Sequence, residues 1–534
     1  MNNLREICFH RLLLASLVLT VAPALAAGAG GSPRVVHEMK HDVSLPLREM
    51  ARTVLPGKRA PYEKAEGRAP RGYFHQAPGA DSVVQNGYLP TISTTQLLSF
   101  DAITGDQGQA IPPDTNGSVG STQFVEITNV VLEVFDKTTG QVLLAPTLIN
   151  AIWKGFGGLC ESTNGGDPVV LWDKLAQRWF VSQLAYNRTQ AALCLAVSTS
   201  SDATGSFNRY AFSTGTNFPD YPKYSVWSDA YYGTNNLYGP RNYLGAEPCA
   251  FNRAAMLSGK KATAVCMTPV PGSFGFLPSD LDGGTLPPEG SPNHYVDLGN
   301  LTNQLKEFDF HVDFAHPTQS TFKGPHVIPV PTFTLLCNDG GNFACVPQPS
   351  PGERVDSLSG LLMFRLAYRN FGDHESMVVA HAVKPGKSST ATVATRWYEL
   401  RSQNQGEFSL YQCGTFQDKT DNLWMASIAM DKQGNIAMGM SADSSSSLDT
   451  SVWYTGRLAS DPLGKMETPT VVVKGTALQV NGGNRWGDYS SMSIDPSDDC
   501  TFWYSQEYYN KTNGGPQSND WTSHLVSFKF NGCQ

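Results

Sequence analysis

The stretch RWGDYSSMSIDPSDDCTFWYSQEYY, residues 485–509, has the pattern of two β-strands joined by a tight turn. A Gly-Asp pair precedes the first strand-like run, an Asp-Pro turn ends it, and a run rich in aromatic residues follows. Aspartate and proline favour such turns, because the carboxylate accepts backbone N–H bonds and the proline ring fixes φ. The same order of residues recurs along the chain, and this recurrence predicts the fold.

The repeated pattern extends over most of the chain. From about residue 95 onward, short runs rich in Val, Tyr, Phe and Trp alternate with clusters of Gly, Asp, Asn and Pro. Helices are disfavoured, because the 50 glycines and 34 prolines would interrupt most of them. The strand-like runs fall into groups over residues 116–149, 167–214, 220–270, 283–330, 356–416, 423–483 and 485–530.

These groups predict an all-β fold. A lone four-stranded sheet cannot cover both of its faces, so we expect the units to pack radially, as the blades of a β-propeller do. The prediction is a seven-bladed β-propeller of four-stranded antiparallel blades; six or eight blades, or an array of β-sandwiches, are the alternatives. The last group lacks a fourth strand. We expect residues 94–103, TTQLLSFDAI, to supply it and close the ring, which removes two exposed sheet edges.

The N-terminal region has two parts. In residues 1–26, Arg11 precedes the apolar run LLLASLVLTVAPALA, which ends in small residues, as a secretory signal peptide does. Residues 27–92 are rich in Pro, Gly, Ala and charge without periodicity, and predict a flexible leader or propeptide before a propeller domain at 93–534. No later run approaches the ~20 apolar residues of a membrane span. We therefore predict a protein secreted to the periplasm or the exterior.

One motif in the leader resembles a zinc site. The run HEMKH, residues 37–41, matches H-E-x-x-H, which binds zinc when a helix places both histidines on one face. A metalloprotease would need a folded sheet before that helix, and the run DVSLPL, with its proline, follows directly. We therefore interpret residues 37–41 as part of a polar leader segment and not as a zinc site.

The cysteines predict disulfides. Nine cysteines follow the signal segment, and an exported chain permits disulfides. Pairing of nearest neighbours gives Cys160–Cys194, Cys249–Cys266, Cys337–Cys345 and Cys500–Cys533. Cys413 remains as a buried free thiol.

The charge of the chain limits its partners. The first 92 residues hold 11 basic and 7 acidic residues, whereas the rest hold 28 basic and 40 acidic residues. An acidic body argues against nucleic acid, because phosphate binding requires positive charge. The expected partner is a glycan or another cell-surface ligand, and the expected state is a monomer.

Two kinds of aspartate recur. Those that end the first strand of a group, such as Asp173 and Asp495, are expected to cap hairpin turns. Those that precede the first strand are Asp114, Asp167, Asp220, Asp356, Asp421 and Asp488. Since the first strand of a propeller blade is innermost, we expect these six carboxylates at one mouth of the central channel.

Such a ring of like charges needs compensation. Lys223 and Arg485 are near these aspartates in the sequence and could pair with them. A bound calcium ion could also compensate the charge, because calcium prefers oxygen ligands, but the sequence does not specify which residues would bind it. The structural alternative is that each aspartate caps the loop entering its own blade.

Aromatic residues beside these aspartates point to sugars. Tyr221, Trp424 and Tyr489 offer faces on which sugar rings stack, and a carboxylate pair can cleave a glycoside. The predicted function is therefore glycan binding or hydrolysis at an axial site. Its catalytic residues would be Asp167, Asp220 and Asp488, and its ligand-binding residues would be Asp114, Tyr221, Lys223, Asp356, Asp421, Trp424, Arg485 and Tyr489. The alternative is a non-catalytic extracellular scaffold or adhesion module that binds a protein partner.

Several segments carry a resemblance to a known group. STSSDATGSF, residues 198–207, resembles the Asp-box turn of sialidase-type propellers, with Phe207 in place of Trp. The segments PPDTNG (112–117), LAYRNFGDHES (366–376) and WGDYSSMSIDP (486–496) are similar to exported bacterial sialidase-like propeller proteins of unassigned activity. The resemblance implies a propeller fold and export. It supplies no reaction, since the sequence has no Arg-Ile-Pro motif.

Overall fold

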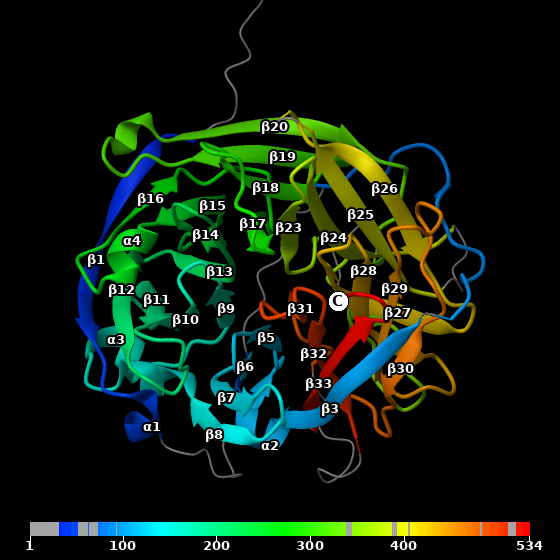
Figure 1. The fold of residues 1–534 in the computed structure, drawn as a ribbon, viewed down its shortest axis with the longest axis horizontal. Coiled ribbons are helices and arrows are strands. Elements are labelled where there is room, and N and C mark those ends of the chain that lie inside the picture. The colour runs from blue at the N-terminus through cyan, green and yellow to red at the C-terminus, as the bar shows by residue number, and fades with distance from the viewer. Residues whose placement is uncertain are drawn as a thin grey trace, which may run out of the picture.

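Four-stranded sheets surround a common axis in the computed structural model (Figure 1). The structure describes residues 31–51, 62–63, 73–91, 93–337, 344–386, 392–403, 406–480, 483–510 and 520–534. Within these residues the sheets divide into seven blades, which confirms the predicted propeller. The predicted signal segment, residues 1–26, lies outside the described residues.

Each blade consists of antiparallel strands that run in order from the axis to the rim. Blade 1 contains β5 (Asn116–Val119), β6 (Gln123–Thr128), β7 (Val131–Asp136) and β8 (Val142–Leu148). Blade 2 contains β9 (Val169–Asp173), β10 (Arg178–Tyr186), β11 (Ala191–Ser198) and β12 (Phe207–Gly215). Blade 3 contains β13 (Phe218–Val226), β14 (Tyr231–Tyr238), β15 (Tyr243–Phe251) and β16 (Thr263–Met267). Blade 4 contains β17 (Leu277–Asp282), β18 (Asn293–Leu298), β19 (Gln304–His311) and β20 (Thr321–Pro329). Blade 5 contains β23 (Leu366–Asn370), β24 (Glu375–Val383), β25 (Ala394–Ser402) and β26 (Ser409–Phe416). Blade 6 contains β27 (Asp421–Met430), β28 (Ile436–Ser444), β29 (Ser451–Arg457) and β30 (Thr470–Val473).

The seventh blade closes the ring as expected. It contains β31 (Ser491–Ile494), β32 (Phe502–Tyr509) and β33 (Trp521–Phe530), and its fourth strand is β3 (Thr94–Thr104), which pairs antiparallel with β33. The N-terminal part of the domain therefore completes the last sheet and covers the edge of β33.

Short elements lie in the leader, between blades and in the loops within blades. They are the helices α1 (Leu47–Met50), α2 (Gly105–Gly108), α3 (Gly158–Ser162) and α4 (Arg253–Leu257), the 3-10 turns η1 (Ile149–Trp153) and η2 (Pro317–Gln319), and the strands β2 (Tyr62–Glu63), β4 (Ala110–Ile111), β21 (Ala344–Val346) and β22 (Val355–Asp356). No helix among the described residues is long and apolar enough to cross a bilayer.

Two strand assignments differ from the sequence analysis. The inner strand of blade 4 is Leu277–Asp282, which lies before the predicted group at 283–330. The outer strand of blade 6 is Thr470–Val473, whereas the sequence favoured residues 476–483. Both are short, and only their pairing with neighbouring strands distinguishes them from other apolar runs.

The leader contains a structured strand, contrary to the flexible segment that the sequence predicted. Strand β1 (Pro33–Val43) pairs with β12 of blade 2 and with β16 of blade 3, so it joins the rims of two blades into one sheet (Figure 1). The HEMKH run lies in this strand, where His37 and His41 are about 13 Å apart along the chain. They therefore cannot bind one ion together. Whether residues 27–92 are removed during export stays a prediction.

Aromatic side chains pack between neighbouring blades, and disulfides add covalent links. Between blades 2 and 3, Phe180 packs on Tyr224 and Tyr231 with ring centroids 5.2 and 4.9 Å apart. Gly439 leaves room for Tyr504 of the next blade, since an added Cβ would lie 2.4 Å from that ring. All four predicted disulfides form, namely Cys160–Cys194, Cys249–Cys266, Cys337–Cys345 and Cys500–Cys533, and Cys413 is a buried free thiol, as expected.

Candidate functional site

Three of the aspartates that precede the inner strands, Asp114, Asp167 and Asp488, meet at one end of the channel in a closed ring of hydrogen bonds. The backbone N–H of Asp488 donates to Asp114 Oδ1 (2.7 Å), and Asn129 Nδ2 donates to Asp114 Oδ2 (2.7 Å). The backbone N–H of Asp167 donates to Asn129 Oδ1 (2.8 Å), and that of Tyr221 donates to Asp167 Oδ2 (3.0 Å). Tyr221 Oη then donates to the carbonyl of Asp488 (3.2 Å). We call these five residues the axial ring.

Cationic and aromatic side chains surround the axial ring. Arg485 contacts Asp488 (3.1 Å) and Asp356 (3.0 Å) through its two terminal nitrogens. The Lys223 ammonium lies 2.9 Å from the ring centroid of Tyr221 and 3.7 Å from that of Tyr489. The structure thus brings together the predicted cations and most of the predicted carboxylates.

Backbone geometry explains how carboxylates reach the next blade. Asp114 and Asp167 have φ of 50° and 48°, and Tyr221 has φ of 53°, in the left-handed region. Aspartate is tolerated there better than most residues, whereas tyrosine is uncommon. The surrounding hydrogen bonds hold this strained backbone, and Asp114 and Asp167 accept bonds from Asp488 of blade 7 and Tyr221 of blade 3.

Three predicted residues make contacts outside the axial ring. Asp220 is opposite Asn236 in the pairing of β13 with β14, and its charge acts on Tyr243. Asp421 begins β27 and accepts a bond from Thr420 Oγ1 (3.2 Å). Trp424 packs against Trp486 inside the protein, with ring centroids 5.6 Å apart.

The axial ring is buried. Asp114 and Asp167 are 0% exposed, and Asp488 is 4% exposed. Burial, together with the charge of Asp167, raises the pKa of the Tyr489 phenol well above its usual value. In this structure Asp114 and Asp167 accept hydrogen bonds from the loops of other blades, which is neither an open rim nor the capping of their own loops. Their predicted role in catalysis stays a prediction.

The other aspartates cap turns, as the sequence indicated. Asp173 accepts the backbone N–H groups of Leu175 (3.1 Å) and Ala176 (3.0 Å), and Asp495 accepts that of Ser497 (2.8 Å). In the Asp-box-like turn, Asp202 accepts the N–H of Thr204 (2.9 Å). These turns fix the far ends of the hairpins.

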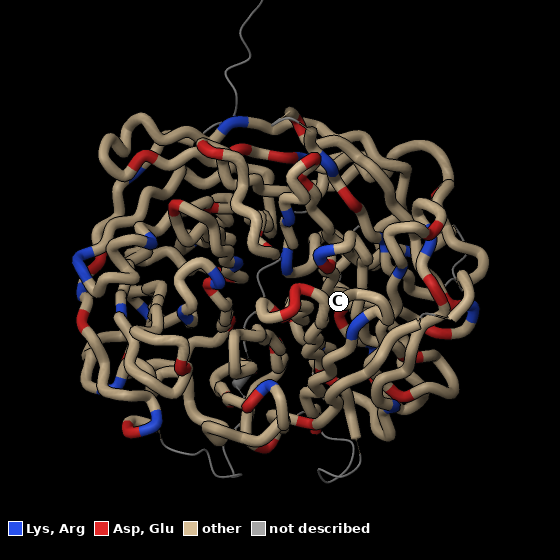
Figure 2. Tube along the Cα trace, in the orientation of Figure 1, with Lys and Arg blue, Asp and Glu red and all other residues tan. Residues whose placement is uncertain are grey.

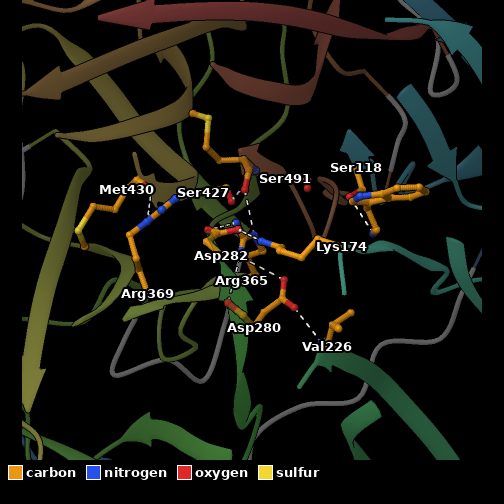
Figure 3. A network of polar contacts seen from close by, with 12 residues as sticks. Ser118, Lys174, Val226, Asp280, Asp282, Arg365, Arg369, Ser427, Met430 and Ser491 are labelled. Atoms are coloured by element: carbon orange, nitrogen blue, oxygen red, sulfur yellow. Dashed lines mark hydrogen bonds and ion pairs between the residues drawn. The ribbon is translucent and has the colours of Figure 1, made fainter. Parts of the chain in front are cut away.

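A second polar network lies toward the opposite end of the inner strands (Figure 3). Arg365, just before β23, contacts Asp280 Oδ2 (3.1 Å) and Asp282 of β17. Lys174, in the turn after β9, contacts Asp282 Oδ1 (3.2 Å). Asp280 also accepts the backbone N–H of Val226 (2.9 Å) from blade 3. The network therefore connects blades 2, 3, 4 and 5.

Burial and pairing set the charges of this network. Burial raises the pKa of Asp280 despite the adjacent Arg365. Burial would also raise the pKa of Asp282, but Arg365 and Lys174 together lower it. Burial lowers the pKa of Lys174, against the opposing effect of Asp282. Basic and acidic residues both surround the centre of the ring in Figure 2, and this network pairs them.

A further ion pair lies beside the network. Arg369 of β23 holds both oxygens of Asp499, at 2.6 and 2.7 Å, and donates to the carbonyl of Met430 (3.1 Å). Gly283 (φ 75°) passes so close that an added Cβ would lie 2.5 Å from Arg369. A glycine is therefore needed where the blade 4 hairpin meets this ion pair.

Two cavities adjoin the network. One, of about 20 Å³, lies in the channel between Ser118, Asp282, Arg365 and Ser491, and has room for one water molecule. The other, about 680 Å³, we call the mouth cavity. Its lining residues come from the first hairpins of blades 1, 2, 4 and 7 and are Ser121, Trp172, Lys174, Leu175, Gln177, Gly283, Gly284, Ile494, Pro496, Ser497 and Asp499. Gln177, Gly284 and Ser497 are exposed, so the cavity opens to solvent.

The sequence predicted no site at this end of the channel. The segment DLDGG (280–284) resembles a calcium loop, yet Asp280 and Asp282 bind Arg365 and Lys174 instead. The sequence does contain two acidic residues, Asp280 and Asp282, and two basic residues, Arg365 and Arg369, that could have predicted ion pairs. The parallel pairing of β17 with β23 brings these two sets together.

Comparisons with known proteins concern the fold. No model of a protein family matches the chain, and no curated protein matches its sequence. Similar solved structures include the WD40 domain of SCAP from fission yeast (9% identity, TM-score 0.31, 77% of this chain and 82% of that chain). They also include polysaccharide lyase Uly1 (10%, 0.37, 83% and 100%) and an endo-arabinase from Bacteroides thetaiotaomicron (13%, 0.27, 56% and 95%). At such low scores none of them bears on activity, and the order of the chain's own strands identifies it as a seven-bladed β-propeller.

Proposed function

We propose that the protein is a secreted β-propeller that binds a glycan in the mouth cavity. The cavity carries the proposal: it measures about 680 Å³, opens to solvent and is lined by residues of four blades. Ligand sites in proteins are typically concavities of this size that combine apolar surface with a few polar groups. Four disulfides are consistent with an oxidising compartment outside the cytoplasm.

The lining of the cavity suits a polyhydroxylated ligand. Trp172 and Ile494, both buried, form the apolar part of the lining, while Gln177, Ser121 and Ser497 provide donors and acceptors. The neighbouring charges are paired, with Lys174 on Asp282 and Arg369 on Asp499. A site with balanced charge favours neutral sugars over strongly anionic ones, since no net positive charge attracts an anion.

The geometry favours binding over hydrolysis. Asp499 is the carboxylate that lines the mouth cavity, and Arg369 already holds both of its oxygens. Glycoside cleavage needs two carboxyl groups that are free to exchange a proton or attack the sugar. The catalytic version of the proposal uses Asp167, Asp220 and Asp488, and it requires an opening of the axial ring.

Binding can be tested with a matched pair of variants. Gln177 and Gln433 occupy corresponding hairpin turns of blades 2 and 6, but Gln177 lines the mouth cavity and Gln433 bonds to the carbonyl of Gly532 (3.3 Å). On a panel of neutral and uronate-containing oligosaccharides, Q177A should weaken binding by about tenfold, the value of one lost hydrogen bond. Q433A should bind as the wild type does. Equal affinities for all three proteins, or no binding by any, would exclude this site.

The alternative is an adhesion module, and one observation favours it. Strand β1 and the two residues that follow it expose Met39 (57%), Val43 (55%) and Leu45 (65%) on the rim of blades 2 and 3. Exposed apolar side chains that lie close together are typical of contacts with another protein. A protein that binds no oligosaccharide but loses attachment to cells when these three residues become Ser would support the alternative.

A further inference from the structure

We propose that blade 4 contains a binding site for one divalent transition-metal ion, formed by His294, Glu307, Asp309 and His326. This site is separate from the mouth cavity and does not depend on the glycan proposal. His294 Nδ1 lies 2.9 Å from Glu307 Oε1 and 2.8 Å from Asp309 Oδ1. One ligand atom from each of these three residues lies within 4.8 Å of the other two.

The strand register puts the four residues on one face of the blade. In the pairing of β18 with β19, His294 is directly opposite Asp309. In the pairing of β19 with β20, Glu307 is directly opposite His326. Since Glu307 and Asp309 are two apart on β19, their side chains leave the sheet on the same side. The two histidines, on β18 and β20, therefore flank the two carboxylates of the middle strand, and the register of β19 with β20 shifts between Glu307 and Asp309.

The distances fit a coordination sphere. Ligands about 2.1 Å from a metal lie about 3.0 Å apart along an octahedral edge and about 3.4 Å apart along a tetrahedral edge. The two His294 contacts, 2.9 and 2.8 Å, match an octahedral edge. His326 Nε2, 3.9 Å from Asp309 Oδ2, lies within the range of a fourth ligand after a small side-chain movement.

The second ring nitrogen of His326 supports the assignment. His326 Nδ1 lies 3.5 Å from Glu407 Oε1, a residue of the neighbouring blade. A metal-binding histidine typically donates its other N–H to a carboxylate, which fixes the tautomer and turns the free nitrogen toward the ion. Glu407 can perform this function for His326.

The environment of His294 leaves it few other partners. The His294 side chain is 9% exposed, and it packs against Phe408 with ring centroids 4.7 Å apart. Its Nε2 has no hydrogen-bond partner among the described residues, so the two carboxylates are its polar contacts there. Only one proton on Nδ1 is available for two carboxylates, whereas a metal ion would satisfy the imidazole and both acids together.

The ligand set indicates the class of metal. Imidazole suits zinc, iron and nickel, and carboxylates suit harder ions such as manganese, so a mixed set favours a first-row divalent ion over calcium. The His326 and Asp309 side chains are 37% and 31% exposed, which leaves space for water at the outer side of the ion. The ion would cross-link the three outer strands of blade 4.

Zinc alone is a suitable probe. The full chain, after treatment with a chelator and dialysis, should bind one Zn²⁺ per molecule in calorimetry, and its melting temperature should rise with zinc concentration. H326Q and H294Q should each weaken binding at least tenfold. H326Q is the decisive variant, because the half-exposed side chain can be changed with little effect on folding, which circular dichroism confirms.

His524 provides the matched control. It pairs across neighbouring strands with one carboxylate, Asp101, at 2.7 Å in blade 7, and H524Q should leave zinc binding unchanged. Substitution of Co²⁺ should give visible absorption that H326Q removes. The proposal is overturned if the wild type binds no stoichiometric zinc, or if H326Q and H294Q bind it as tightly as H524Q. In that case the cluster is a protonated His294 shared between two acids.

Discussion

The backbone N–H of Asp488 donates a 2.7 Å hydrogen bond to the carboxylate of Asp114, and this bond joins the last blade to the first. The two residues are 374 positions apart in the chain. Asn129, Asp167 and Tyr221 extend the contact through blades 2 and 3 and return it to Asp488. Such a closed, buried network stabilises only when every member is satisfied.

The first prediction concerns this ring. In D114N the new amide would face Asn129 Nδ2, which now donates to Asp114 Oδ2, so two donors would meet in a buried place. We expect a loss of roughly 1–3 kcal/mol in the free energy of unfolding, the cost of a buried polar group without its partner. Urea denaturation followed by tryptophan fluorescence measures it.

D421N is the control for D114N. Asp421 also precedes an inner strand but is partly exposed and bonds to the neighbouring Thr420. We expect its effect on unfolding to stay within about 0.5 kcal/mol. If both variants lose the same stability, or if D114N abolishes glycan binding without destabilising the protein, the axial ring is a ligand site and not a link between blades.

The sequence predicts those features that depend on local patterns. Alternation of apolar residues between Asp and Gly turns marks most strands, and the count of strands requires the closing strand at 94–104. Cys249 and Cys266, for example, pair because the successive strands β15 and β16 bring them together. These inferences need no knowledge of distant contacts.

The missed features depend on contacts far apart in the chain. Strand β1 has little apolar periodicity, and its order comes from the edges of β12 and β16, roughly 170 to 230 residues later. Asp114 and Asp167 do precede inner strands as predicted, but each accepts from the loop of another blade, which only the closed ring makes possible. The Lys174–Asp282–Arg365 network likewise combines three blades.

The second prediction concerns that network. Arg365 is 4% exposed and contacts Asp280 and Asp282, so R365M would leave two buried carboxylates without their main cation. We expect a loss of roughly 3–5 kcal/mol in the free energy of unfolding. The triple variant D280N/D282N/R365M removes all three charges and should recover a large part of it. If R365M is as stable as the wild type, the network contributes nothing to the free energy of unfolding.

The third prediction concerns the leader. Because β1 covers the outer edges of β12 and β16, a chain that begins at residue 46 should expose two sheet edges. We expect this shortened protein to melt at a lower temperature and to aggregate more readily than one that begins at residue 31. Mass spectrometry of the exported protein should find residues 33–43 retained. A mature protein that lacks them and keeps full stability would contradict the structural role of β1.

The fourth prediction concerns two glutamates that face each other in blade 1. Glu126 of β6 is paired with Glu133 of β7, and both are buried. Burial raises the pKa of Glu126 to about 7, and burial and the charge of Glu126 raise the pKa of Glu133 to about 8. The folded protein therefore binds more protons than the unfolded chain between about pH 4.5 and pH 8, and its stability should fall as the pH rises through that range.

E133Q tests this relationship, since the amide stays neutral at every pH. It should melt as the wild type does at pH 5, where Glu133 is protonated in the folded protein, and at least about 2 °C higher at pH 8.5. Asp136, near Glu133 at the end of the same strand, is the control, because hydrogen bonds from Thr139 lower its pKa. D136N should therefore give no such gain at pH 8.5. If E133Q shows the same difference from the wild type at both pH values, Glu133 is ionised in the folded protein, and the opposed glutamates do not set its pH dependence.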